Sequence, residues 1–86
     1  MPERLRDARR KVVGVKETMK AVQNATAMTV YVAADAEQRI VRPLQQAAIQ
    51  AGIELVSIES MRLLGRLCAI DVGAAAAALL KDNVPR

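Results

Sequence analysis

Residues 28–34, MTVYVAA, are rich in β-branched side chains and form too short a run for a stable helix, so they predict a buried strand. Residues 53–58, IELVSI, predict a second strand on the same grounds. Between them, residues 43–52 predict a helix, because Pro43 suits the first helical position and Gly52 suits the residue just after the last turn. Strands that alternate with helices indicate an α/β protein, a three-layer α/β/α sandwich around a small sheet.

Two helices are predicted before the first of these strands. Residues 3–11 carry apolar side chains three and four apart, and the Val-Val-Gly sequence at residues 12–14 ends that pattern. Residues 16–24 resume a helical period and stop at Asn24, a residue type that tolerates the left-handed backbone common at helix ends. A helical pair is therefore expected in the first quarter of the chain.

The last third of the chain contains one clear helix and one ambiguous segment. Ser60 is a good N-cap for a helix that continues to Leu67, and residues 69–73 are expected to form a loop. Residues 74–80 include five consecutive alanines and fit two structures. Alanine is the best helix former, yet seven small apolar residues also suit a strand buried on both faces. The residues alone leave this choice open.

Length and composition exclude many catalytic and metal-binding classes. A chain of 86 residues has room for one core, so residues 1–86 are expected to form a single domain. The absence of histidine and the single cysteine exclude zinc fingers, histidine-based catalytic sites and disulfide frameworks. We therefore expect no catalytic residue, no metal and no cofactor. Cys68 is predicted to be a small buried filler, and a lone cysteine suits a cytoplasmic protein.

Positive charge is concentrated at the start of the chain. Residues 1–20 hold seven basic and three acidic side chains, whereas residues 21–86 hold six of each, so the whole net charge of +4 lies in the first segment. Such asymmetry is typical of a surface that meets a polyanion, although a solvated helical arm has the same composition. The charged N-terminus is not followed by the apolar run of seven or more residues that a signal peptide needs, and no segment approaches the length of a membrane span, so no membrane partner is expected.

The stretch GVKETMK at residues 14–20 is the strongest candidate for a binding site. A helix that begins directly after Gly14 presents free backbone N–H groups and a positive dipole end, which suit phosphate. Lys16 and Lys20 share one helical face with Glu17 beside them. Two cations can hold phosphates while a carboxylate accepts hydrogen bonds from base amino groups. An amphipathic helix with a solvated charged face is the alternative.

The loop AIDVG at residues 69–73 is the second candidate. Ile70 and Val72 flank Asp71, and they either plug the core or form an apolar rim for an unstacked base. Arg66, four residues before Ile70, is placed to reach a nearby phosphate. The carboxylates of the chain form no recognisable acid–base pair, so an enzyme is not expected.

These motifs together carry a family resemblance. GVKETMKA at residues 14–21, VYVAADA at 30–36 and IESMRLLG at 58–65, running into IDVGAA at 70–75, occur in the order and at the spacing found in the kink-turn-binding ribosomal protein family. This group includes L-seven-Ae and L-thirty-e, and the chain resembles its short bacterial members over roughly residues 3–80. The resemblance implies a small mixed four-stranded sheet between helices, with the alanine-rich segment as its last strand.

The resemblance also implies recognition of the kink-turn, an RNA internal loop with tandem sheared G·A pairs and a sharply bent backbone. By position, Gly14 allows close approach of the backbone to the RNA, and Glu17 accepts hydrogen bonds from guanine edges. Lys16 stands where many members have asparagine and short bacterial members often have lysine. Lys20 matches the phosphate-contacting lysine of the family.

The second motif matches the family loop that closes over the extruded nucleotide. Ile70, Asp71 and Val72 match its apolar–acid–apolar pattern, and Asp71 replaces a more usual glutamate. Ala69 stands where glycine is typical, which implies a stiffer loop, and Val15 replaces a typical threonine in the first motif. Each departure bears on RNA preference.

The sequence therefore predicts a protein that recognises and stabilises kink-turns in structured RNA, such as ribosomal RNA, a riboswitch or another non-coding RNA. It is expected to be a monomer when free and to act without catalysis. A DNA-binding module and a protein-interaction module that use the basic first quarter are the alternatives.

Overall fold

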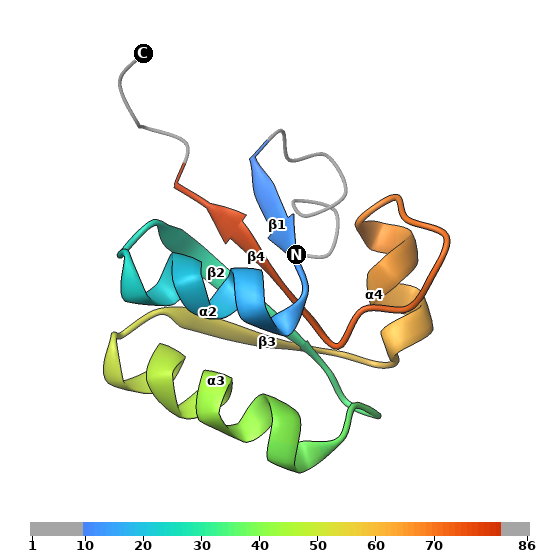
Figure 1. Ribbon diagram of the computed structural model, residues 1–86, viewed down its shortest axis with the longest axis horizontal. Coiled ribbons are helices and arrows are strands. Elements are labelled where there is room, and N and C mark those ends of the chain that lie inside the picture. The colour runs from blue at the N-terminus through green and yellow to red at the C-terminus, as the bar shows by residue number, and fades with distance from the viewer. Residues whose placement is uncertain (1–9, 82–86) are drawn as a thin grey trace.

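The computed structural model of the protein describes residues 10–81. Its elements follow one another in the order β1 (Lys11–Val13), α2 (Val15–Gln23), β2 (Ala27–Ala33), α3 (Gln38–Gln50), β3 (Glu54–Ile58), α4 (Met61–Leu67) and β4 (Ala76–Leu80). Figure 1 shows their arrangement. The helix predicted over residues 3–11 lies almost wholly outside the described residues. At its end the prediction is wrong for Lys11, because this residue belongs to strand β1.

The strands form a mixed four-stranded sheet in the order β1-β4-β2-β3. β2 and β3 run parallel, with Val30 opposite Leu55, because α3 returns the chain to the same end of the sheet. β4 runs antiparallel to both of its neighbours, so that Ala78 lies opposite Val30 of β2 and Val12 of β1. The predicted sheet is thus confirmed.

Helices cover both faces of this sheet. Residues 29–33 of β2 and residues 76–79 of β4 are all buried, and neighbouring residues of a strand point to opposite faces. A strand buried at every position therefore has a packed layer on each side. α2 and α3 contact each other, whereas α4 lies apart from them and contacts β2, β3 and β4 (Figure 1). The predicted three-layer α/β/α sandwich is confirmed.

The alanine-rich segment is a strand because of where it lies. Ala76, Ala77 and Ala78 are completely buried, in a strand paired on both edges and covered on both faces. Close-packed layers leave room at these positions for little more than a methyl group. The tertiary setting therefore outweighs the helical propensity of alanine, as it does for many strands.

The rest of the core is aliphatic, with one aromatic ring. Tyr31, Leu44 and Leu64 are the largest fully buried side chains, one each from β2, α3 and α4. Cys68 follows α4 and is buried, as predicted for a small filler. Burial raises the pKa of its thiol, and the ammonium group of Lys11 offsets part of that rise. The thiol therefore stays protonated and unreactive at neutral pH.

Two details of the helices differ from the sequence-based expectation. α3 begins at Gln38, so Pro43 lies inside the helix and not at its start. Proline removes a helical hydrogen bond, but Val41 and Leu44 on either side of it are completely buried, and this packing holds the helix together. Asn24 ends α2 as predicted, but with φ −88°, and the left-handed residue is Ala25 at φ 60°.

The close fit around β4 predicts that added volume is not tolerated there. Ala77→Leu is expected to lower the free energy of unfolding by about 1 to 3 kcal/mol, because overpacking forces strained rotamers and backbone shifts. Ala51→Leu, at an exposed position after α3, is the matched control and is expected to change it by less than about 0.5 kcal/mol. Urea denaturation measures both, and equal effects of the two substitutions would contradict the fit described for β4.

Candidate nucleic-acid interface

Gly14 forms the junction between β1 and α2. Its backbone angles, φ 104° and ψ 150°, lie in a region that is almost restricted to glycine. A Cβ atom built on Gly14 would meet nothing within 4 Å, so the backbone angles and not lack of space require glycine. The Gly14 N–H donates a 2.8 Å hydrogen bond to the carbonyl of Ala76 at the start of β4. The start of α2 is thereby fixed to the first residue of an inner strand, and the space at the Cβ position of Gly14 is open.

The first turn of α2 is uncapped. Gly14 has no side chain to accept a hydrogen bond, none from elsewhere in residues 10–81 does so at this helix start, and the Thr18 N–H is bonded to the Gly14 carbonyl at 2.9 Å. The N–H groups that precede Thr18 in a helix have no acceptor within it, and the helix dipole adds partial positive charge there. The arrangement favours an acceptor-rich, negatively charged ligand.

Three charged side chains stand on the outer face of α2. Lys16, Glu17 and Lys20 are exposed, whereas Thr18, Ala21 and Val22 are buried on the opposite face. Lys20 Nζ lies 3.9 Å from Glu17 Oε2, with both side chains more than half exposed. A loose, solvated pair of this kind contributes about 0 to 1 kcal/mol, so a ligand can readily take over either partner.

The loop between α4 and β4 lies directly on α4. The Ile70 N–H donates to the carbonyl of Gly65 and the Ala74 N–H to that of Met61, both at 3.0 Å. A Cβ atom on Gly65 would collide with the carbonyl of Val72, so only glycine lets the loop pack this closely. Two hydrogen bonds and one close contact therefore tie the loop to α4.

The side chains of this loop divide into buried and exposed groups. Ile70 is half-buried and packs against the core, whereas Val72 is 69 % exposed and Asp71 is exposed. Ile70 thus contacts the core, and it also borders the hollow beside the loop. Ala69 has a φ of 62°, which is unfavourable for any residue with a Cβ.

Beside the loop lies a hollow of about 370 Å³. It is lined by Arg62, Arg66, Ile70, Asp71, Val72 and Gly73. Arg66, Ile70, Asp71 and Val72 were expected at a site from the sequence, but Arg62 was missed. Its spacing of four residues from Arg66 on α4 is the signal that places the two arginines on one helical face.

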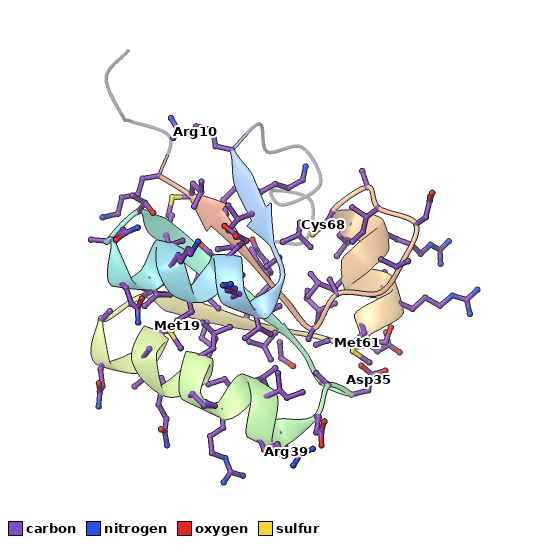
Figure 2. All side chains as sticks on the ribbon, in the orientation of Figure 1. Arg10, Met19, Asp35, Arg39, Met61 and Cys68 are labelled. Carbon is purple, nitrogen blue, oxygen red and sulfur yellow. The ribbon has the colours of Figure 1, made fainter. Side chains whose placement is uncertain are left out.

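The two predicted motifs meet at one end of the sheet. The backbone of Gly14 is bonded to Ala76, and the N–H of Ala33 at the end of β2 donates to Ala75 at 2.9 Å. Asp35, in the turn after β2, accepts a 2.7 Å hydrogen bond from the N–H of Met61, the first residue of α4. Figure 2 shows Asp35 and Met61 next to each other at this end. The N-terminus of α2 and the α4–β4 loop are thus held on a shared support.

Val15 is a second predicted site residue, after Ile70, that packs against the core. Its side chain is half-buried, so it anchors the first turn of α2 from below. Gly14, Lys16, Glu17 and Lys20 form the accessible part of the first motif. Within residues 10–81, no cluster of three or more metal-ligating side chains is found, and no helix there is long and apolar enough to cross a membrane.

Comparison with known proteins assigns the chain to a family. Residues 2–84 match the Ribosomal protein L7Ae/L30e/S12e/Gadd45 family. The match spans nearly the whole sequence, so the chain belongs to this family, and the resemblance noted from its motifs is confirmed.

Individual relatives agree with this assignment. An RNA-binding protein of Caldanaerobacter subterraneus subsp. tengcongensis is 49 % identical over 69 residues, which cover 80 % of this chain and 84 % of the relative. Large ribosomal subunit protein eL8 of Halobacterium salinarum is 40 % identical over 68 residues, 78 % of this chain and 57 % of that protein. A solved structure, the 15.5kD RNA binding protein of Giardia lamblia, superposes with a TM-score of 0.84 at 30 % identity and covers 95 % of this chain and 69 % of its own.

The junction at Gly14 yields a prediction about α2. Gly14→Ala is expected to lower the free energy of unfolding by about 1 to 3 kcal/mol, because alanine is strained at these backbone angles. The same substitution is expected to shift the backbone amide resonances of Val15, Lys16 and Glu17, as α2 reorients. Urea denaturation and ¹⁵N NMR spectra measure the two effects.

Gly52→Ala, just after the C-terminal end of α3, provides the matched control. Gly52 also has a positive φ, 71°, and open space at its Cβ position. Its replacement is expected to cost about 1 kcal/mol and to leave the amides of residues 15–17 unchanged. If Gly14→Ala behaves like this control, the junction does not set the position of α2.

Proposed function

We propose that this protein binds RNA and recognises the kink-turn, an internal loop with tandem sheared G·A pairs. The observation that carries the proposal is the open junction at Gly14, where an uncapped helix presents Glu17 between two exposed lysines. Membership of a ribosomal protein family and the RNA-binding names of its relatives support it. The role is one of binding, without catalysis.

The charged groups of α2 have separate tasks in this account. The carboxylate of Glu17 accepts hydrogen bonds from guanine amino and imino groups, which sheared G·A pairs expose in a widened groove. Lys16 and Lys20 neutralise phosphates on either side, which supplies affinity without sequence information. In the free protein Lys20 contacts Glu17 at 3.9 Å, and this ion pair is weak enough to be replaced by contacts with RNA.

The α4–β4 loop supplies the second contact. The exposed side chain of Val72 offers an apolar surface to a nucleotide that the sharp bend of a kink-turn leaves unstacked. Asp71 beside it offers an acceptor for the base edge. Ile70 supports the loop from the core side. In this proposal, only the bent RNA allows α2 to contact the G·A pairs while the α4–β4 loop contacts the unstacked nucleotide.

Such a protein acts by selecting one RNA conformer. Because backbone hydrogen bonds hold the start of α2 to Ala76 of β4 and the α4–β4 loop to α4, both contact regions are expected to change little on binding and to match one RNA shape. A protein that binds the kinked state more tightly than extended states shifts the RNA toward the kink by that difference in affinity.

The first test is titration of the protein against a kink-turn stem-loop at near-physiological salt. The control RNA has Watson–Crick pairs in place of the G·A pairs. The proposal predicts tight binding to the kink-turn and a loss of about 4 kcal/mol or more on the control. Weak and equal binding to both RNAs would contradict it and would favour a general polyanion patch or a protein partner. Preference for duplex DNA would favour the DNA-binding alternative.

Substitutions on α2 test the separate tasks. Glu17→Ala is expected to reduce discrimination between the two RNAs by about 1 to 3 kcal/mol, because the base-reading acceptor is lost. Gln23→Ala, an exposed change on the same helix, is the control and is expected to leave discrimination intact. An equal loss of affinity for both RNAs in Glu17→Ala would show that Glu17 does not read the bases.

Lys20→Gln is expected to weaken binding to both RNAs and to reduce the slope of log K against log salt by about 0.7 to 0.9, the effect of one phosphate contact. Lys81→Gln removes the same charge beside Ala25 and Gly52 at the opposite end of the sheet and is expected to leave the slope unchanged. Identical slopes for the two variants would show that Lys20 acts only through net charge.

A further inference from the structure

The outer face of α4 carries two exposed arginines. Arg62 and Arg66 are exposed and one helical turn apart, while Leu64 and Gly65 between them are buried. Within residues 10–81 the structure shows no ion pair for either guanidinium group, in contrast to Arg39, which lies 2.8 Å from Glu37 Oε2. Both arginines border the hollow beside the α4–β4 loop.

The opposite wall of the hollow is rigid. It is formed by residues 70–73, which are held on α4 by the hydrogen bonds of Ile70 and Ala74 and by the close contact of Val72 with Gly65. Its volume of about 370 Å³ is at the small end of the roughly 300 to 1,000 Å³ typical of ligand sites. The hollow is therefore within the size range of sites that take a small ligand unit such as one nucleotide.

The lining points to a nucleotide phosphate in a strand and not to a free anion. A guanidinium group matches a phosphate with two parallel hydrogen bonds, and two such groups on adjacent turns span more than one phosphate oxygen. The carboxylate of Asp71 borders the same hollow and repels a small isolated anion. In a nucleotide the phosphate can lie toward the arginines while the base faces Asp71 and Val72.

We propose that Arg62 and Arg66 form a phosphate site on the outer face of α4, which holds the backbone of the RNA strand that passes over the α4–β4 loop. This inference rests on the proposed RNA binding and adds a contact region separate from α2. It assigns a role to Arg62, which lies outside the two candidate binding stretches, residues 14–20 and 69–73.

Salt dependence of kink-turn RNA binding tests the site. Arg62→Gln and Arg66→Gln are each expected to weaken binding about ten-fold and to reduce the slope of log K against log salt by about 0.7 to 0.9. The double variant is expected to reduce the slope by about twice that amount. Arg42→Gln, an exposed arginine on α3 for which the described residues show no ion pair, is the control for net charge and is expected to leave the slope unchanged.

A second experiment locates the phosphate. Kink-turn RNAs with a single neutral methylphosphonate at successive positions are titrated against wild-type protein and against Arg62→Gln. At the contacted position, the neutral linkage is expected to weaken wild-type binding about ten-fold and to leave Arg62→Gln binding unchanged, since the partner is already lost. Additive losses at every position would overturn the proposal.

The two proposals fail in different ways. If wild-type protein distinguishes the kink-turn from its Watson–Crick control but both arginine variants keep the wild-type slope, the α4 phosphate site is wrong and kink-turn recognition stands. If wild-type protein binds both RNAs equally, kink-turn recognition is wrong, and the slopes on either RNA still decide whether the α4 arginines hold phosphate. If wild-type protein binds neither RNA, both proposals are wrong.

Discussion

The start of β4 is the point on which the candidate interface depends. Ala76 accepts the N–H of Gly14, Ala75 accepts the N–H of Ala33, and the N–H of Ala74 is bonded to Met61. Three connections that are far apart in the sequence are thereby held within one hydrogen bond of the same short segment. Because β4 is an inner strand of the sheet and is buried over residues 76–79, this support belongs to the part of the molecule that opens least readily.

The candidate interface combines a backbone held in place at two glycines with charged side chains that are exposed to solvent. Backbone geometry is fixed at Gly14 by its unusual angles and at Gly65 by the carbonyl of Val72 above it. The charged groups, by contrast, are exposed and weakly engaged, as the 3.9 Å contact of Glu17 with Lys20 shows. This combination favours specificity through shape and affinity through phosphate neutralisation, which is how proteins commonly distinguish folded RNA from plain duplex.

The sequence predicted correctly those elements that depend on interactions between residues close together in the chain. Ser60 caps α4, as expected, by accepting the N–H of Leu63 at 3.0 Å. The alanine-rich strand was ambiguous from propensity, since only its neighbours in the sheet exclude a helix, and the family resemblance resolved it. Lys11 was misassigned because strand pairing with Leu79 is a long-range effect. The support given by Asp35 to α4 was likewise not predictable, because it joins residues 26 positions apart.

The central claim is that one end of the sheet forms a composite RNA-binding surface from α2 and the α4–β4 loop. The most direct measurement is a titration of ¹⁵N-labelled protein with a kink-turn RNA, followed by backbone amide resonances. The account predicts large changes over residues 14–20 and over residues 62–73, with little change around Ala25, Met28 and Gly52 at the other end of the sheet. Changes confined to one of the two segments, or centred on the other end, would contradict it.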